Sequence, residues 1–212
     1  MNIRRSVAKL RKIGFLADVH NDLDGLCRAL DVLRDCDRIF HLGDLIEDDP
    51  EANAVLELLT GRNITGVVGY HDELALTTGS HIDQRFRSYL EGLPRQIVRG
   101  DFYLVHDNPL SKEKGEGLTA AGGYIRDEYT AGRVFEESVV RILVVGHTHR
   151  AEQYVWADGN VEKCAIAQLA LDPARRYILN PGSVCNQFRG TAPSVGVFDL
   201  ARSRFEIRLL QP

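Results

Sequence analysis

The chain repeats one pattern five times: a short apolar run that ends in a histidine or an aspartate. The polar residues that follow these runs are, in chain order, Asp18 and His20, Asp44, His71, His106, and His147 and His149. Short β-rich runs that alternate with helical segments predict an α/β sandwich, and sheets of that kind bind ligands beyond the carboxyl ends of their strands. We therefore expect imidazoles and carboxylates from distant parts of the chain to meet at one rim.

Length and composition limit the class of protein. With 212 residues and 44% hydrophobic content, we expect one domain over residues 1–212. The net charge of −4 gives no general electrostatic reason to bind nucleic acid or an anionic membrane. The chain contains neither a membrane-spanning apolar stretch nor a signal-peptide pattern, so we expect a cytoplasmic protein. The four cysteines form no CxxC pair and are expected to be reduced structural thiols.

The first half of the sequence reads as β-loop-α units. Strands are expected at 12–17, 38–42 and 64–68. The helix after the first strand has Asn21 or Asp22 as its cap, and the second helix opens at Asp49-Pro50 and closes at Gly61. Residues 84–91 are also predicted to be helical.

The second half is richer in strands. A hairpin is expected from 96–99 and 102–106, and the short runs from residue 142 onward predict the second sheet of the sandwich. The connection 107–123 is long, polar and glycine-rich, which fits a functional loop or lid and equally a merely mobile loop.

Two motifs each place a pair of ligand atoms on one turn. Asp18-x-His20 follows a strand, where alternate residues share a side, and Gly146-His147-x-His149 adds a glycine that permits a tight turn. Either motif alone also fits buried histidines that backbone groups satisfy. The combination of motifs is more specific for a metal site than any one of them. In chain order the motifs are DxH, GD, an HD pair, a strand-end histidine and GHxH.

In this order the motifs resemble those of the calcineurin-like metallophosphoesterases, in particular the small prokaryotic phosphodiesterase type. The resemblance runs from Asp18 to about Ser183 and includes a late turn, Asn180-Pro181-Gly182-Ser183. It implies a four-layer α/β/β/α sandwich of two mixed sheets, with a metal site at the carboxyl rim of the strands.

The resemblance also implies two divalent transition-metal ions. The ligands would be Asp18, His20 and His149 for one ion, His106 and His147 for the second, and Asp44 as the bridge. Two ions about 3.5 to 4 Å apart can hold a bridging hydroxide that attacks phosphorus directly. Mixed imidazole and carboxylate ligation suits manganese, iron, zinc or nickel better than calcium and does not choose among them.

The third motif of the family supplies the candidate catalytic residues. By analogy, His71 would act as general acid or phosphate stabiliser, with Asp72 fixing its tautomer or raising its basicity. The family normally has an asparagine ligand of the second metal where this chain has Tyr70. Tyr70 could ligate as a phenolate, give way to a water, which we favour, or leave the second metal weakly bound. A packing role without a catalytic part is equally open.

Two arginines join Tyr70 as candidate substrate contacts. Arg150 follows the last metal histidine and Arg189 follows the late turn, and either could pair bidentately with a phosphate. An ordinary surface arginine is the commoner explanation for each. His41 lies within a strand run and is expected in the core or behind the ligands rather than among them.

The leading hypothesis is a binuclear metal-dependent phosphoesterase that hydrolyses a small soluble phosphodiester, phosphomonoester or nucleotide. The alternative is a catalytically weak metal-binding scaffold on the same fold, which predicts lost ligands, whereas only the Tyr70 position departs. A nuclease is disfavoured by the negative net charge and the lack of an added basic domain. The sequence names neither the substrate nor the oligomeric state.

Overall fold

Two six-stranded mixed sheets face each other in the computed structural model, which describes residues 10–78, 81–112, 124–164, 166–186 and 191–211. The first sheet contains β1 (Lys12–Leu16), β2 (Arg38–His41), β3 (Thr65–Gly66), β9 (Gln168–Ala170), β11 (Ser194–Asp199) and β12 (Arg204–Leu209). The second sheet contains β4 (Gln96–Arg99), β5 (Phe102–Val105), β6 (Ile142–Val144), β7 (Gln153–Ala157), β8 (Asn160–Cys164) and β10 (Arg176–Leu179).

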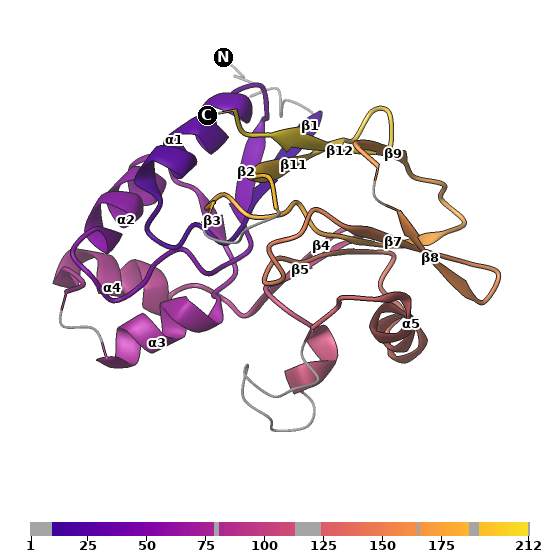
Figure 1. The fold of residues 1–212 in the computed structure, drawn as a ribbon, viewed down its shortest axis with the longest axis horizontal. Coiled ribbons are helices and arrows are strands. Elements are labelled where there is room, and N and C mark those ends of the chain that lie inside the picture. The colour runs from indigo at the N-terminus through magenta and orange to yellow at the C-terminus, as the bar shows by residue number, and fades with distance from the viewer. Residues whose placement is uncertain (1–9, 79–80, 113–123, 165, 187–190, 212) are drawn as a thin grey trace, which may run out of the picture.

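Helices form the two outer layers (Figure 1). The helices are α1 (Leu23–Val32), α2 (Ala52–Gly61), α3 (Tyr70–Thr78), α4 (Gln84–Glu91) and α5 (Glu128–Glu137), with a 3-10 turn at Pro109–Lys112. The first four lie on the side of the first sheet, and α5 packs on the outer face of the second sheet. The predicted four-layer α/β/β/α sandwich is therefore confirmed.

The predicted distribution of strands between the sheets is wrong in part. The strand order is β3-β2-β1-β11-β12-β9 in the first sheet and β4-β5-β6-β10-β7-β8 in the second. Three late strands thus join the first sheet, because β11 pairs antiparallel with β1 from Lys12↔Asp199 to Phe15↔Gly196. A continuous apolar run shows that both faces of a strand are covered, but it does not reveal which strand is its neighbour in the sheet.

Alternating side chains of β1 and β6 fill three separate apolar layers. In β1, Ile13 and Phe15 face the second sheet, whereas Leu16 points to the helices. In β6, Ile142 faces the first sheet and Leu143 points to α5. A strand covered on both faces reads as a continuous apolar run, which is why these segments carry so few polar residues before their ends.

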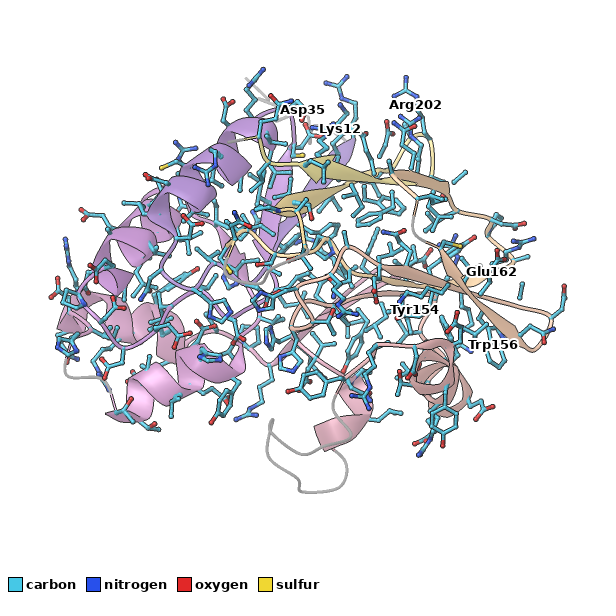
Figure 2. All side chains as sticks on the ribbon, in the orientation of Figure 1. Lys12, Asp35, Tyr154, Trp156, Glu162 and Arg202 are labelled. Carbon is cyan, nitrogen blue, oxygen red and sulfur yellow. The ribbon has the colours of Figure 1, made fainter. Side chains whose placement is uncertain are left out.

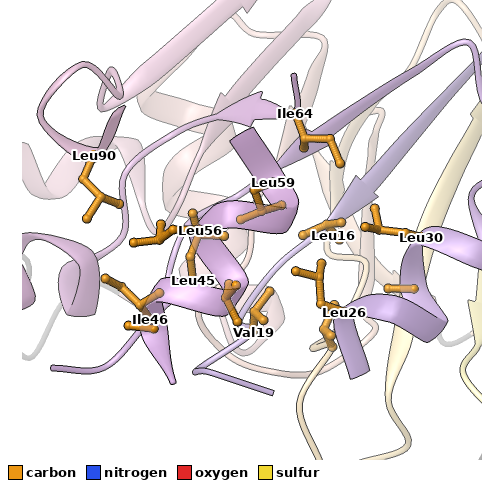
Figure 3. Close-up of a cluster of buried hydrophobic side chains, with 14 of the residues drawn as sticks. Leu16, Val19, Leu26, Leu30, Leu45, Ile46, Leu56, Leu59, Ile64 and Leu90 are labelled. Carbon is orange, nitrogen blue, oxygen red and sulfur yellow. The ribbon is translucent and has the colours of Figure 1, made fainter. Parts of the chain in front are cut away.

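The outer apolar layers fix the helices on the sheets. Leu16 of β1 and Leu30 of α1 belong, with Leu56 and Leu59 of α2, to the cluster under the first four helices that Figure 3 shows. On the other side, Tyr154 and Trp156 of β7 lie on the side of α5 (Figure 2).

The predicted caps and loops are only partly matched. The Asp22 side chain accepts the backbone N–H of Gly25 and caps α1, as one of the two alternatives predicted. Helices α3 and α5 are not anticipated by the sequence analysis. Most of the long connection 107–123 lies outside the described residues.

In the described part of the chain, no helix has the length and apolar character that crossing a membrane requires.

Parallel pairing brings the motif loops to one rim. β1 pairs parallel with β2, and β6 pairs parallel with both β5 and β10. The carboxyl ends of β1 and β2 therefore point the same way, as do those of β5, β6 and β10 in the second sheet, and the motif residues follow directly after these strands.

Candidate metal centre

Backbone hydrogen bonds hold the four motif loops against one another. The Asp18 N–H donates to the Gly43 carbonyl at 3.0 Å, which joins the loops after β1 and β2. The Gly146 N–H donates to the His106 carbonyl at 2.9 Å and joins the loops after β5 and β6. The two sheets are linked in turn, because the His147 N–H reaches the Asp18 carboxylate at 3.0 to 3.1 Å.

Left-handed backbone conformations concentrate at this rim. Five of the six predicted metal ligands have positive φ: Asp18 (54°), His20 (44°), Asp44 (52°), His147 (70°) and His149 (58°). Each such residue other than glycine costs on the order of 1–3 kcal/mol and persists only where surrounding structure imposes it. A row of strained residues that all carry ligand atoms is typical of a functional site.

A first cluster of ligand atoms lies at the ends of β1 and β6. The Nε2 atoms of His20 and His149 are 3.2 Å apart, and His149 Nε2 lies 3.7 Å from Asp18 Oδ1. All three residues are buried. Unprotonated imidazole nitrogens that face each other across a carboxylate form a suitable set of donors for a transition-metal cation.

A second cluster adjoins the first. His106 Nε2 lies 3.0 Å from Asp44 Oδ2 and 3.2 Å from His147 Nδ1. His106 Nδ1 lies 2.6 Å from the Leu42 carbonyl, which can only accept, so Nδ1 carries the proton and Nε2 is directed to the cluster. Asp44 Oδ2 is also 4.0 Å from His20 Nε2, which places this one carboxylate between the two clusters.

Burial and neighbouring charges shift the pKa values of these groups in opposite directions. Burial raises the pKa of Asp18 to about 8. Burial would raise the pKa of Asp44 as well, but the His106 imidazolium outweighs it and holds that pKa below its ordinary value. Burial lowers the pKa of His147 to about 4 and that of His149 to about 3. The last two imidazoles are therefore neutral near pH 7, as metal ligands must be.

The third motif forms the start of α3 rather than a loop. The His71 N–H donates to Asp44 Oδ1 at 2.9 Å, so the helix N-terminus faces the Asp44 carboxylate. Gly69 must be glycine here, because a Cβ at this position would lie 2.2 Å from Asp44 Oδ1. The approach of α3 to the metal centre thus depends on a residue without a side chain.

The predicted contact between Asp72 and the His71 ring is absent, although both residues are described. The buried Asp72 carboxylate accepts backbone N–H groups from Leu45 at 2.8 Å, Ile46 at 3.3 Å and Gly69 at 2.9 Å. The Asp72 carboxylate therefore connects the loop after β2 to the segment that begins α3.

Glu47 makes the contact that was expected of Asp72. Its carboxylate lies 2.9 Å from His71 Nδ1 and 2.7 Å from His20 Nδ1. Glu47 therefore touches both a predicted ligand and the predicted general acid. It was missed because the same loop also contains Asp48, Asp49 and Glu51, and the sequence alone does not distinguish them.

The late Asn-Pro-Gly-Ser turn supports the centre from behind. Ser183 Oγ donates to the Asp18 carbonyl at 2.9 Å, and Asn180 Nδ2 donates to the Gly146 carbonyl at 2.8 Å. The buried Cys185, one of four free cysteines, places Sγ 3.8 Å from His149 Nδ1. The turn thus ties the first and last motifs together, a role that its sequence alone does not reveal.

The other sequence candidates have varied positions. Tyr70 is half-buried with its ring 5.4 Å from that of His71, and it does not line the cleft described below. Arg150 lines that cleft, whereas Arg189 lies outside the described residues. His41 lies outside both clusters, because it is fully buried with Nε2 3.0 Å from the Tyr89 hydroxyl. Burial lowers the pKa of His41 to about 3.

A cleft of about 470 Å³ opens over the two clusters. Its lining consists of His20, Asp44, Glu47, His71, Tyr124, Arg126, His147, Thr148, His149 and Arg150. The Tyr124 ring stacks on His147 with centroids 4.5 Å apart and forms part of the wall. The volume lies within the range of small-molecule sites.

The sequence profile of the calcineurin-like phosphoesterase superfamily domain matches residues 12–203. The chain belongs to this superfamily. An uncharacterized protein of Methanocaldococcus jannaschii is 26% identical over 219 residues, which cover 92% of this chain and 85% of that protein.

Two solved structures have the same fold. A metallophosphoesterase from Sphaerobacter thermophilus has a TM-score of 0.78 at 23% identity, covering 96% of this chain and 89% of its own. A novel archaeal phosphodiesterase has a TM-score of 0.55 at 18% identity, covering 94% and 99%. Superfamily members are in general metal-dependent hydrolases of phosphoesters, and the resemblance found in the motifs is thereby confirmed.

Proposed function

We propose that this protein is a cytoplasmic, binuclear metal-dependent phosphoesterase that hydrolyses a small soluble phosphodiester, phosphomonoester or nucleotide. One observation carries the proposal: Asp44 Oδ2 lies between the two histidine clusters, 3.0 Å from His106 Nε2 and 4.0 Å from His20 Nε2. A shared buried carboxylate is the group that a pair of metal ions requires as a bridge. The partner is a small phosphorylated molecule rather than a nucleic acid or a membrane, since the net charge is −4.

The donor set fits divalent transition metals. Asp18, His20 and His149 would hold one ion, His106 and His147 the other, and Asp44 would bridge. Ions held by these residues would supply an activated water at neutral pH and would stabilise the charge on the phosphoryl group. Manganese, iron, zinc and nickel all suit such ligands, and manganese is the ion to test first.

The protein groups around the metals would orient the ester. The N-terminus of α3 points its backbone N–H groups and positive dipole end at the centre, a favourable place for a phosphate. His71 lines the cleft and is held by Glu47 through Nδ1, so its Nε2 is the nitrogen that can meet a substrate oxygen. In the proposed reaction the His71 ring is doubly protonated, with Nδ1–H on Glu47, and its Nε2–H would pass a proton to the departing oxygen while a water attacks phosphorus directly, without a covalent enzyme intermediate.

The first test is metal analysis together with hydrolysis of bis-p-nitrophenyl phosphate and p-nitrophenyl phosphate after reconstitution with manganese. We expect about two metals per chain and turnover of at least one ester. Asp44→Asn should lower the occupancy of both metals. His71→Ala should keep the metals and slow turnover of an alkyl phosphate ester, whose poor leaving group needs an acid. A wild-type protein that binds two metals and hydrolyses neither ester would contradict the proposal.

Tyr70 decides between the enzyme and the scaffold alternative. The wild type could contain about one metal per chain and show no turnover, while Tyr70→Asn regains the second metal and turnover. That result would mean that Tyr70 has disabled the second metal site, and the scaffold would then be the better proposal. Equal metal content and equal rates in the two proteins would assign Tyr70 to packing.

The stereochemical course tests the direct attack separately. Hydrolysis of a chiral phosphorothioate ester should invert the configuration at phosphorus, because each in-line displacement inverts it and direct attack involves only one. Retention would require two displacements and therefore a covalent intermediate on the protein.

A further inference from the structure

We propose that Arg126 and Arg150 form a second anion-binding subsite in the cleft, and that the substrate carries a further phosphate group beyond the phosphoryl group that reacts. This inference rests on the proposed phosphoesterase function and names the class of substrate that the cleft would take.

Both arginines line the cleft that contains the candidate metal centre. Arg150 follows His149 directly in the chain, while Arg126 is two residues beyond Tyr124, whose ring stacks on His147 with an interplanar angle of 24°. The two guanidinium groups therefore come from separate segments of the chain, each anchored next to a predicted metal ligand. Segments so anchored can hold an anion at a fixed place relative to the metals.

Neither guanidinium forms an ion pair with a carboxylate among the described residues, and the charge of Arg126 acts only at longer range on its chain neighbour Asp127. Several other arginines of the described residues are paired, among them Arg95 with Glu73, Arg133 with Glu137 and Arg141 with Asp101. The exposed Arg62 makes no ion pair in the described part of the chain either, but it does not line the cleft. Two carboxylates also line the cleft, and both are engaged: Asp44 contacts His106 and the His71 N–H, and Glu47 contacts His20 and His71. The arginine side of the cleft therefore keeps its positive charge.

The charge arrangement favours a second phosphate over additional contacts to the reacting one. In the proposed centre, two divalent ions, the N-terminus of α3 and His71 already serve the reacting phosphoryl group. Two further cations that are exposed at the wall of a 470 Å³ cleft exceed what one phosphoryl group needs. Guanidinium groups bind phosphate oxygens bidentately, and unneutralised ones also attract anions from a distance.

A matched pair of chromogenic substrates tests the subsite. Thymidine 5′-(p-nitrophenyl phosphate) and its 3′-phosphorylated form share the reacting ester and differ only in the second phosphate. The test variant carries both Arg126→Gln and Arg150→Gln. The control variant is Arg62→Gln, which removes an exposed arginine at the end of α2 that does not line the cleft. The measured quantities are KM and kcat at saturating manganese.

We expect the wild type to have about a tenfold lower KM for the 3′-phosphorylated substrate, as charge-assisted hydrogen bonds of ordinary strength give. The double variant should lose that preference while its KM for the one-phosphate substrate changes by less than about twofold, and Arg62→Gln should behave as the wild type. Equal KM values for both substrates in the wild type would overturn the subsite. An equal loss on both substrates in the double variant would overturn it too, because the arginines would then serve the reacting phosphoryl group.

A binding measurement separates this inference from the proposed function. Titration calorimetry compares the affinities of thymidine 3′,5′-bisphosphate and thymidine 5′-monophosphate. The difference measures what the second phosphate adds to binding, whether or not the protein hydrolyses an ester. Tighter binding of the bisphosphate that the double variant abolishes supports the subsite even in an inactive protein. Equal binding of the two nucleotides by wild type rejects the subsite even in an active enzyme.

Discussion

The carboxylate of Glu47 lies 2.9 Å from Nδ1 of His71, at the wall of the cleft over the candidate metal centre. A carboxylate only accepts when ionised, so His71 Nδ1 carries the proton and Nε2 is the nitrogen that remains for substrate. Glu47 also contacts Nδ1 of His20. One glutamate thereby sets the orientation of a predicted ligand and of the predicted general acid.

Removing Glu47 should slow the reaction in a manner that depends on the leaving group. At saturating metal, we expect Glu47→Ala to lower kcat for an alkyl phosphate ester by about 10- to 100-fold, because a poor leaving group needs a well-placed acid. The rate for a p-nitrophenyl ester should change by less than about threefold, since p-nitrophenolate departs without a proton. Steady-state rates on both esters measure the difference.

The exposed Glu91 at the end of α4 provides the matched control, and Glu91→Ala should leave both rates unchanged. Equal losses of kcat on the two esters in Glu47→Ala would show that Glu47 acts on the metal ligand His20 rather than through His71.

The close approach of Gly69 to Asp44 makes a second prediction. Alanine at position 69 would place its Cβ 2.2 Å from Asp44 Oδ1 and 2.2 Å from the Asp44 backbone nitrogen, so the bridging carboxylate must move. We expect the metal content of Gly69→Ala to fall from about two to below one per chain. Gly61 at the end of α2 has no atom within 4 Å of its Cβ position, and Gly61→Ala should keep both metals. Full metal content in Gly69→Ala would refute this account of the bridge.

The six candidate ligands could be recognised in the sequence because each follows an apolar strand run in a short motif. The structure brings all six to one rim. Glu47 could not be predicted, since its role depends on how the loop after β2 folds across the start of α3. The prediction that the late strands all belong to the second sheet was wrong for a related reason. β11 pairs with β1, and these two segments are remote in the chain.

The third prediction separates Asp72 from its neighbour His71. Asp72→Ala removes the acceptor of three backbone N–H groups in a fully buried position, so we expect the free energy of unfolding to fall by about 2 to 3 kcal/mol. His71 is partly exposed, and His71→Ala should change that free energy by less than about 0.5 kcal/mol. Urea denaturation of the metal-free proteins measures both. Equal stabilities of the two variants would contradict the bracing role of Asp72.

The fourth prediction concerns an ion cluster on the first sheet. The Asp35 carboxylate lies 2.7 Å from Arg208 Nη1 and 2.5 Å from Lys12 Nζ, and Lys12 and Asp35 lie together in Figure 2. The hydrogen bonds from Arg208 and Lys12 hold the pKa of Asp35 well below its ordinary value. A carboxyl group whose pKa is lower in the folded than in the unfolded state stabilises the fold above the unfolded pKa of about 3.9. That stabilisation is lost as the pH falls further, through the folded pKa.

Asp35→Asn should therefore lower the free energy of unfolding at pH 7 by about 0.5 to 1 kcal/mol, a small effect because the Asp35 side chain is 42% exposed and solvent screens the pair. The gap between variant and wild type should narrow as the pH is lowered below about 4, where the unfolded carboxyl takes up its proton. Asp31, 71% exposed and paired only with Arg34 three residues on, is the control, and Asp31→Asn should change stability by less than about 0.3 kcal/mol. Urea denaturation at several pH values measures all three proteins. A gap that widened on acidification would mean that the Asp35 pKa is raised by folding, and the cluster would then not stabilise the sheet.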